Sequence, residues 1–365
     1  MACMVPFLAV YYREVGLNGA QIGLLAGIAP VITWLAALLW GAAADATRRH
    51  RAYLVAATLG AMGMVALLAQ ARTMAWLLPV VLAYAFFTAP IMPLIDNSVM
   101  ALLGKQSASY GRLRLWGAVG WGIAGAGAGV LMEQVGIGAM FGGYILFMAL
   151  GLTVATRLTI RPMAAAQPFW AGLRGLTTNR DLLVFLATVL VGSMGSVVVH
   201  TFLFLYMADL GAGATLMGVS LTVATLSEIP VFFFSAWLLR KLGARGLLMV
   251  AMAAYVVRLG AFGLMPSVWW VLPINLLHGL TFAALWVAGV SYANQIAPPG
   301  MGATVQGLFA GIVMGLGAAL GALAGGALYD AYGAPTLYRL AALWMAAGVL
   351  FFWLAGGQRR APVTD

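Results

Sequence analysis

Apolar residues run along this chain in long blocks separated by short polar turns, and this pattern predicts membrane-spanning helices. A span needs about 20 consecutive apolar residues. Residues 1–12 form an apolar block that is too short to span. The predicted spans are 20–44, 52–71, 75–103, 113–132, 137–158, 182–207, 214–239, 246–265, 268–296, 303–329 and 335–355.

The pattern repeats once along the chain. The segment FLAVYYREVG at 7–16 aligns with FLFLYMADLG at 202–211, and Gly23 matches Gly218 at the same offset. A second match follows, in which a Gly-x-Leu-x-acid-x-x-Gly pattern begins at Gly129 and again at Gly326. A repeat of this kind indicates two halves of like orientation, which is the parallel-repeat design of one large class of transporters.

The repeat predicts the domain boundaries. We expect a first six-helix bundle at 1–158, a cytoplasmic linker at 159–180, a second bundle at 181–356 and a tail at 357–365. The apolar block before Phe202 is much longer than the block before Phe7. We therefore expect the sequence as given to lack the cytoplasmic half of helix 1, with a naturally short first helix as the alternative.

Composition and charge agree with a membrane protein. Hydrophobic residues make up 64% of the chain and charged residues 8%, whereas soluble domains carry roughly 25% charged residues. If helix 1 runs outward, most of the 19 Lys and Arg residues fall in the inner loops and ends. This positive-inside bias predicts that both termini are cytoplasmic and that the protein resides in the plasma membrane. The net charge of +10 therefore reflects topology, and we expect no nucleic-acid partner.

Several ionisable side chains fall inside the predicted spans. An isolated charge there costs roughly 2.5 to 3.5 kcal/mol on insertion scales, so it needs a partner or a function. A carboxylate that is neutral in one state and paired with arginine in another is the chemistry of a proton-coupled carrier. These residues are Asp96, His200, Glu228, Arg258 and His278, with Arg114 near the inner end of its span.

Metal and enzyme chemistry are not expected. The three histidines lie on separate segments without metal-ligand spacing, and the single cysteine, Cys3, excludes an internal disulfide or a cysteine-based metal cluster. The same separation leaves no nucleophile and base pair at an aqueous face. We expect neither an enzyme nor a bound cofactor.

The loop GAAADATRRHR at 41–51 resembles a motif of the major facilitator superfamily: a glycine, three residues, an aspartate and then a basic cluster. The resemblance implies that Asp45, Arg49 and Arg51 form a cytoplasmic gate that closes in one transport state. The alternative is that the arginines only anchor the topology. The chain departs from the motif at Ala46 and Arg48, where the family prefers a basic residue and a glycine.

The segment YGRLRLWGAVGW at 110–121 resembles the fifth helix of the lactose permease group and of related phenylpropionate and nucleoside permeases. The resemblance implies an all-α membrane fold of two six-helix bundles related by pseudo-twofold symmetry. It also implies that Asp96, Arg114 and Trp121 hold the solute. A structural Asp96–Arg114 pair and plain packing of Trp121 are the alternatives.

In the second half, the same resemblance implies that Glu228, Arg258 and His278 couple the proton. The chain departs from the family by carrying Thr281 in place of a proton-carrying glutamate, and Asn275 near the place of a lysine. We therefore assign the proton first to Glu228, which we also expect to contact the solute, and second to Asp96.

Two alternatives apply to the second-half residues. Pro230 follows Glu228 closely, so a loosened helix could leave the carboxylate bonded to backbone. His278 could serve either packing or proton coupling. We interpret His200 as a packing histidine and leave it outside the predicted site.

Together these features predict a secondary transporter that works by alternating access. We expect proton-coupled uptake of a small organic solute, such as a sugar, a nucleoside or an aromatic carboxylate, by a protein that acts as a monomer in the lipid bilayer. Proton-driven efflux or facilitated diffusion is the alternative within transport. A receptor that does not transport is a remote alternative.

Overall fold

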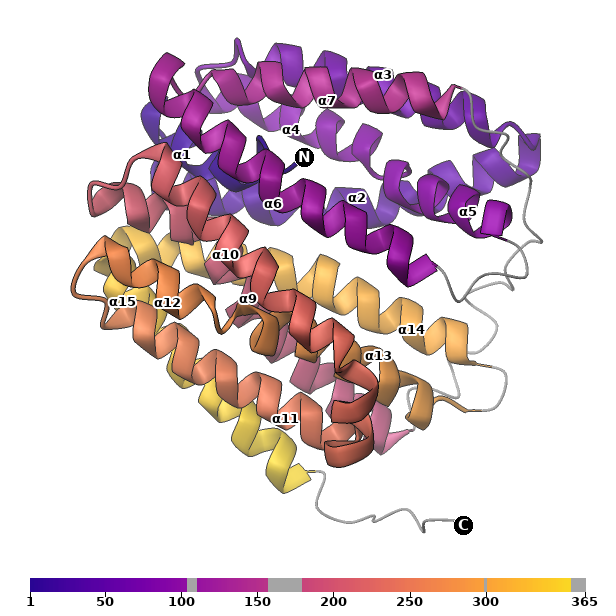
Figure 1. Ribbon diagram of the computed structural model, residues 1–365, viewed down its shortest axis with the longest axis vertical. Coiled ribbons are helices and arrows are strands. Elements are labelled where there is room, and N and C mark those ends of the chain that lie inside the picture. Colours follow the sequence, from indigo (N-terminus) through magenta and orange to yellow (C-terminus); the bar gives the residue numbers. More distant parts are fainter. Residues whose placement is uncertain (104–109, 157–178, 299–300, 356–365) are drawn as a thin grey trace.

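The structure is a computed structural model, and it describes residues 1–103, 110–156, 179–298 and 301–355 (Figure 1). The side chains of 97, 100–115 and 303 are outside the description. The described residues form helices and no strand. Most of the predicted linker at 159–180 and the tail at 357–365 lie outside the described residues. The linker prediction ends one residue late, because Arg180 is already the first residue of a helix.

The described residues of the first half form seven helical segments after a short 3-10 turn, η1 (Val5–Phe7). The predicted span 75–103 is divided between two of them, because the helix is interrupted around Ala89 and Pro90. The segments are α1 (Leu8–Glu14), α2 (Gly19–Thr47), α3 (His50–Leu68), α4 (Met74–Thr88), α5 (Ile91–Leu103), α6 (Tyr110–Val135) and α7 (Ala139–Ala155).

The second half has longer helices and two π-helical turns. Glycines with positive φ, Gly243 and Gly333, divide α11 and α15 into two stretches each. The elements are α9 (Arg180–Asp209), α10 (Ala214–Phe233), α11 (Ser235–Gly263), η4 (Val268–Trp270), α12 (Val271–Asn275), η5 (Gly279–Ala283), α13 (Ala284–Ile296), α14 (Gly302–Gly311), η6 (Ile312–Leu316) and α15 (Gly317–Ala355).

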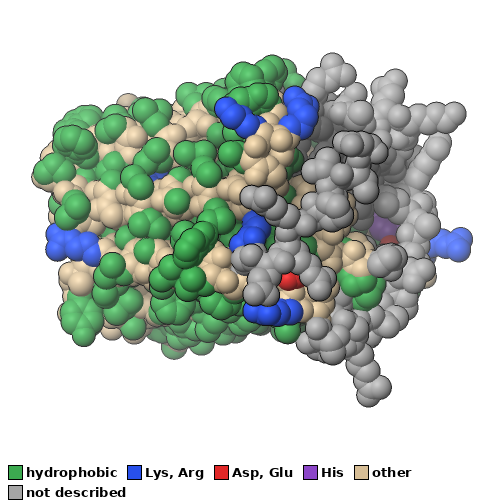
Figure 2. Space-filling view, turned by 90° about the horizontal axis from the view of Figure 1, so that it is seen from below, with side chains coloured by type: hydrophobic (Ala, Val, Ile, Leu, Met, Phe, Trp, Pro, Cys, Tyr) green, Lys and Arg blue, Asp and Glu red, His purple; other side chains and the backbone are tan. Residues whose placement is uncertain are grey.

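The helices match the predicted membrane character. By length and composition, seven helical stretches among the described residues could cross a membrane, or up to eight if one bent pair counts as a single span. That bent pair covers the predicted span 268–296 and turns by 43°. Figure 2 shows hydrophobic side chains over much of one face, with Lys and Arg side chains at several separate places on it.

The internal repeat is visible in the backbone turns. Gly16 and Gly211, which the sequence alignment pairs, have φ values of 91° and 80°. Gly136 and Gly333, the second pair, have φ values of 94° and 75°. Only glycine adopts this left-handed region at little cost, so each pair marks the same turn in both halves.

Among the described residues, the two halves meet where α2 packs against α15 and α6 against α10, and the short α1 also packs against α9 (Figure 1). Gly23 on α2 lies so close to α15 that an added Cβ would come 3.0 Å from the Cα of Gly326. One added at Gly27 would come 2.9 Å from the carbonyl oxygen of Ala319. Small residues at this spacing let two helix backbones approach closely.

We call the α2–α15 and α6–α10 contacts the two seams between the halves. The α6–α10 seam repeats the close approach of glycines seen between α2 and α15. A Cβ added to Gly218, the repeat partner of Gly23, would come 2.6 Å from the carbonyl oxygen of Gly125 on α6. The Thr222 hydroxyl donates to the carbonyl oxygen of Gly122 at 2.8 Å. At Gly117, nearer the start of α6, no described atom lies within 4 Å of an added Cβ. The close contacts of α6 with α10 fall at Gly125 and Gly129.

Candidate functional site

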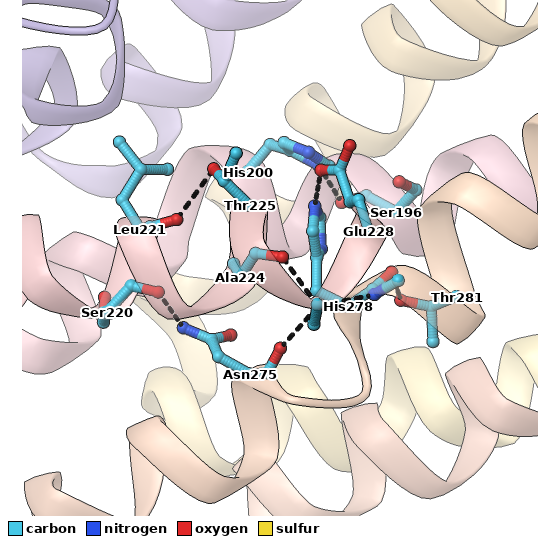
Figure 3. Close-up of polar contacts among 12 residues, drawn as sticks. Ser196, His200, Ser220, Leu221, Ala224, Thr225, Glu228, Asn275, His278 and Thr281 are labelled. Atoms are coloured by element: carbon cyan, nitrogen blue, oxygen red, sulfur yellow. Dashed lines mark hydrogen bonds and ion pairs between the residues drawn. The ribbon is translucent and has the colours of Figure 1, made fainter. Parts of the chain in front are cut away.

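A polar cluster lies between α10, α11 and the bent helix pair in the second half (Figure 3). Glu228 Oε1 lies 3.0 Å from His278 Nε2. On the other side of the same ring, His278 Nδ1 lies 2.7 Å from Arg258 Nη1. The imidazole therefore bridges the carboxylate and the guanidinium. Of the three residues predicted to couple the proton, the structure places His278 between Glu228 and Arg258.

The bridge determines which atoms of His278 carry hydrogen. Arginine has only donors, so Arg258 Nη1 donates to His278 Nδ1, which must be the unprotonated nitrogen. In the neutral imidazole the proton then sits on Nε2, and Nε2–H donates to the Glu228 carboxylate. His278 is thus a neutral ring that forms one hydrogen bond with each of its two charged neighbours.

The remaining contacts of Arg258 are with neutral groups. Nη1 also donates to the Thr281 hydroxyl at 3.0 Å, and Nη2 donates to Asn275 Oδ1 at 2.8 Å. Its Nε is buried with no hydrogen-bond partner among the described residues, and the guanidinium lies 5.5 Å from the centre of the Phe262 ring. The side chain is only 1% exposed. A buried cation that touches no carboxylate in the described chain depends on the more distant Glu228 for charge balance.

The local fold of 275–283 places His278 against α10. Gly279 packs directly on the backbone of Ser227, and no side chain would fit there. The Gly279 N–H donates to the Ser227 hydroxyl at 2.8 Å, and this hydroxyl also contacts the carbonyl oxygen of Asn275 at 3.3 Å. The chain then continues as the π-helical turn η5. Such turns inside α-helices are frequent at functional sites.

Glu228 lies on α10, the helix that packs against α6 of the first half. Thr225, three residues before it and therefore on the same side of α10, lies near Gly122 of α6. The Glu228 side chain is 16% exposed, whereas that of His278 is 10% exposed. The carboxylate is therefore the more accessible end of the bridge.

His200 belongs to the surroundings of this cluster. Its ring centre lies 5.8 Å from that of His278 and 5.8 Å from that of Phe282, at steep angles to both. His278 and Phe282 are parallel, with centres 5.5 Å apart. His200 Nδ1 contacts the Ser196 carbonyl oxygen at 2.9 Å, and the ring is exposed. Figure 3 shows His200 beside Glu228, on the same side of His278.

The predicted solute residues of the first half are described only in part. Asp96 lies on α5 and is half-buried, with an interaction partner in the chain. Trp121 lies on α6 and is half-buried. Arg114 belongs to α6, but its side chain lies outside the described residues. The Asp96–Arg114–Trp121 grouping stays a prediction.

At the end of α2, the partner of Asp45 differs from the one that we expected. Asp45 Oδ1 lies 2.8 Å from His50 Nε2 at the start of α3. Arg49 and Arg51 are both exposed. Arg48 has a positive φ of 55° and ends α2, which turns the chain so that His50 reaches back to Asp45. The structure therefore pairs Asp45 with His50, and the role of Asp45, Arg49 and Arg51 as a gate stays a prediction.

Sequence reasoning missed three contributors to the cluster. Asn275 and Thr281 appeared only as departures from the family, yet both hold Arg258. His200 was interpreted as a packing residue. The four-residue spacing of Ser196 and His200, and of His278 and Phe282, could have indicated two helix faces that share an aromatic contact. The described residues contain no group of three His, Cys, Asp or Glu side chains arranged to hold a metal ion.

Comparison with known proteins places the chain among transporters. The model of the MFS_1-like family matches residues 1–340. The maltose permease of Geobacillus stearothermophilus is 29% identical over 363 residues, covering 98% of this chain and 91% of the permease. The probable 3-phenylpropionic acid transporter of Escherichia coli K12 is 28% identical over 343 residues, covering 90% of this chain and 87% of that protein.

A solved structure shares the fold. The nucleoside transporter NupG superposes with a TM-score of 0.85 at 17% identity, covering 98% of this chain and 96% of NupG. At this identity the likeness supports the fold of two helical bundles alone. The fold prediction is confirmed, and the relatives are transporters rather than enzymes, as we predicted.

Proposed function

The chain belongs to the MFS_1-like family of major facilitator transporters, and from this premise we propose that it imports a small organic solute together with a proton. One observation carries the proposal: Glu228 and Arg258 are linked through a single neutral histidine inside the membrane-spanning part of the second half. A carboxylate in this position changes the charge of the whole cluster when it takes up one proton. Glu228 is therefore our assigned proton carrier.

The cluster gives each residue a separate role. Glu228, the more accessible end, exchanges the proton. His278 holds the carboxylate toward Arg258, which supplies the opposite charge on the other side of the ring. When Glu228 is protonated, the donor on His278 Nε2 loses its anionic acceptor, and the contact between α10 and the bent helix pair weakens. This change favours one of the two transport states over the other.

Asp96 and the first-half residues complete the proposal. Asp96, Arg114 and Trp121 would contact the solute from the first bundle, and Asp96 is the second choice for the proton. We place the protein in the plasma membrane with both termini in the cytoplasm, on the distribution of basic residues. On this orientation, the seams at Gly23 and Gly218 close the outer side.

The test uses purified protein in liposomes with an imposed pH gradient and three labelled solutes: maltose, uridine and 3-phenylpropionate. We expect at least one solute to accumulate with the gradient. Glu228→Gln should abolish accumulation but leave solute exchange, because exchange needs no net proton release. Glu14→Gln, at an exposed carboxylate on α1, is the matched control and should accumulate normally.

The alternatives give different results in the same assay. Efflux would appear as proton-driven movement in the opposite direction, in vesicles whose gradient is reversed. Facilitated diffusion would appear as equilibration that no gradient changes. Accumulation that persists in Glu228→Gln would show that another residue carries the proton.

A further inference from the structure

The charges around Arg258 bear on which solute the site can accept. Among the described side chains, Arg258 bonds only to His278, Thr281 and Asn275, all of them neutral. Its compensating charge is Glu228, one imidazole ring away. Arginine remains protonated at any physiological pH. If Glu228 takes up a proton, as the proposed function requires, the cluster is left with one buried positive charge.

Protonation also leaves a specific donor without its partner. His278 Nε2–H donates to the Glu228 carboxylate at 3.0 Å. Once this carboxylate is neutral, it is a much weaker acceptor, since charged partners make hydrogen bonds roughly twice as strong. The site then combines a buried cation, a donor on His278 Nε2 that has lost its anionic acceptor, and an Arg258 Nε with no hydrogen-bond partner among the described residues. These features are complementary to an anion. A neutral sugar would leave the buried charge uncompensated.

The rings beside the donor suggest what the anion is attached to. His200, His278 and Phe282 form a cluster in which each ring centre lies within 5.8 Å of the other two. His200 is exposed and Phe282 half-buried, so both can contact a solute. Aromatic side chains pair favourably with other rings in tilted or offset arrangements. A solute that carries an aromatic ring within a few ångströms of its carboxylate would therefore contact both the His278 donor and the rings of His200 and Phe282.

We propose that the solute is a small aromatic monocarboxylate, whose carboxylate replaces that of protonated Glu228 on His278 Nε2–H and whose ring lies against His200 and Phe282. This inference rests on the proposed proton coupling. One proton and one monovalent anion enter together, so the transport cycle moves no net charge.

Other charged or titratable groups near Glu228 do not replace this anion. The neighbouring elements contribute Tyr255 and Arg258 from α11, His200 from α9 and His278 before η5, and none of these carries a negative charge at neutral pH. Asp96 belongs to α5, which packs against α3, α4 and α6 in the other half. Arg114 of α6 lies outside the described side chains and, as a cation, would add to the demand for an anion.

The first experiment compares pairs of probes that differ only in charge. Binding of 3-phenylpropionate and of 3-phenylpropionamide is measured by isothermal titration at mildly acidic pH, with maltose and uridine alongside. We expect the acid to bind at least about tenfold more tightly than the amide, as expected for a charge-assisted hydrogen bond. Equal affinity for acid and amide, or preference for maltose or uridine, would overturn the proposal.

The second experiment uses variants of the cluster. In Glu228→Gln the side chain at position 228 is always neutral, so binding of 3-phenylpropionate should persist and lose its pH dependence. His200→Ala should weaken the binding of 3-phenylpropionate more than the binding of acetate, which has no ring. If His200→Ala weakens the binding of 3-phenylpropionate and acetate equally, the solute ring does not contact His200. Thermal unfolding of each variant identifies any that fail to fold, and His200→Phe provides a variant that retains a ring.

The third experiment separates this proposal from the proposed function. Uptake of 3-phenylpropionate into liposomes under a pH gradient is measured with and without a potassium diffusion potential. Uptake that is independent of the potential supports the paired entry of proton and anion. Proton-driven accumulation of maltose or uridine, but not of the acid, would overturn the substrate class and leave transport intact. Accumulation of no probe under any gradient would count against the proposed function itself.

Discussion

Glu133 accepts a hydrogen bond from the backbone N–H of Thr215 at 2.6 Å, so a carboxylate at the end of α6 caps the start of α10 in the other half. Asp330 does the same for Gly19 and Ala20 at the start of α2, at 2.6 and 2.7 Å. The repeat makes Glu133 and Asp330 equivalent residues. Carboxylates are favourable at helix N-termini because free N–H groups and the helix dipole meet there. Two equivalent caps thus tie the bundles together at one end.

Removing both charges should loosen this end. Each cap is expected to contribute about 0.3 to 1 kcal/mol, so the Glu133→Gln/Asp330→Asn variant should favour opening by roughly three- to thirtyfold. The readout is a cysteine at Thr222, whose hydroxyl bonds to Gly122 inside the seam, in a Cys3→Ala background. An impermeant thiol reagent should label it faster in the variant. Unchanged labelling would show that the caps do not stabilise the closed state.

The glycine contacts of the seams predict a stronger effect. Trp at Gly218 or at Gly23 cannot fit, because even a Cβ at Gly218 would meet the Gly125 carbonyl oxygen at 2.6 Å. Each variant should hold the seam open, stop net transport and leave solute binding intact. Gly127→Trp is the control, since no described atom lies within 4 Å of a Cβ there. Transport by Gly218→Trp at the normal rate would mean that the seam need not close.

The helices could be predicted from the sequence because the spacing of apolar blocks depends on membrane thickness. The repeat also predicted which glycines would take equivalent turns. Glu228, Arg258 and His278 were predicted to act together, and they do lie together. These features follow from local pattern, or from resemblance to a family.

The order within the cluster could not be predicted. Whether His278 lies between Glu228 and Arg258, or beside them, depends on the rotation set by the π-helical turn and on the close approach of Gly279 to Ser227. Neither has a reliable signature in a single sequence. The partner of Asp45 was missed for a related reason, because the left-handed Arg48 redirects the chain.

The charge balance of the cluster can be tested through stability. Arg258→Met should destabilise the protein by about 3 to 5 kcal/mol, because it leaves Glu228 and the groups around Arg258 without their partner. Adding Glu228→Gln should restore part of this loss, since no unpaired charge then remains. Reversible unfolding in detergent measures each variant and the double variant. A double variant whose losses simply add would show that the two charges do not interact through His278.

Removing the Asp45–His50 contact should have only a modest effect on closure of the cytoplasmic side and therefore on the transport rate. The side chain of Asp45 is 55% exposed and that of His50 is 8% exposed, so the pair is expected to contribute about 1 kcal/mol or less. Asp45→Asn and His50→Gln should each reduce the transport rate by up to about fivefold, and the double variant should be no worse than either. Arg49→Gln and Arg51→Gln should have smaller effects, because both side chains are exposed in this state. Initial rates of uptake at saturating solute provide the measurement, with protein amounts matched in each liposome preparation. A larger loss of transport rate in Arg49→Gln than in His50→Gln would show that the arginines, and not His50, are the partners of Asp45 in the gate.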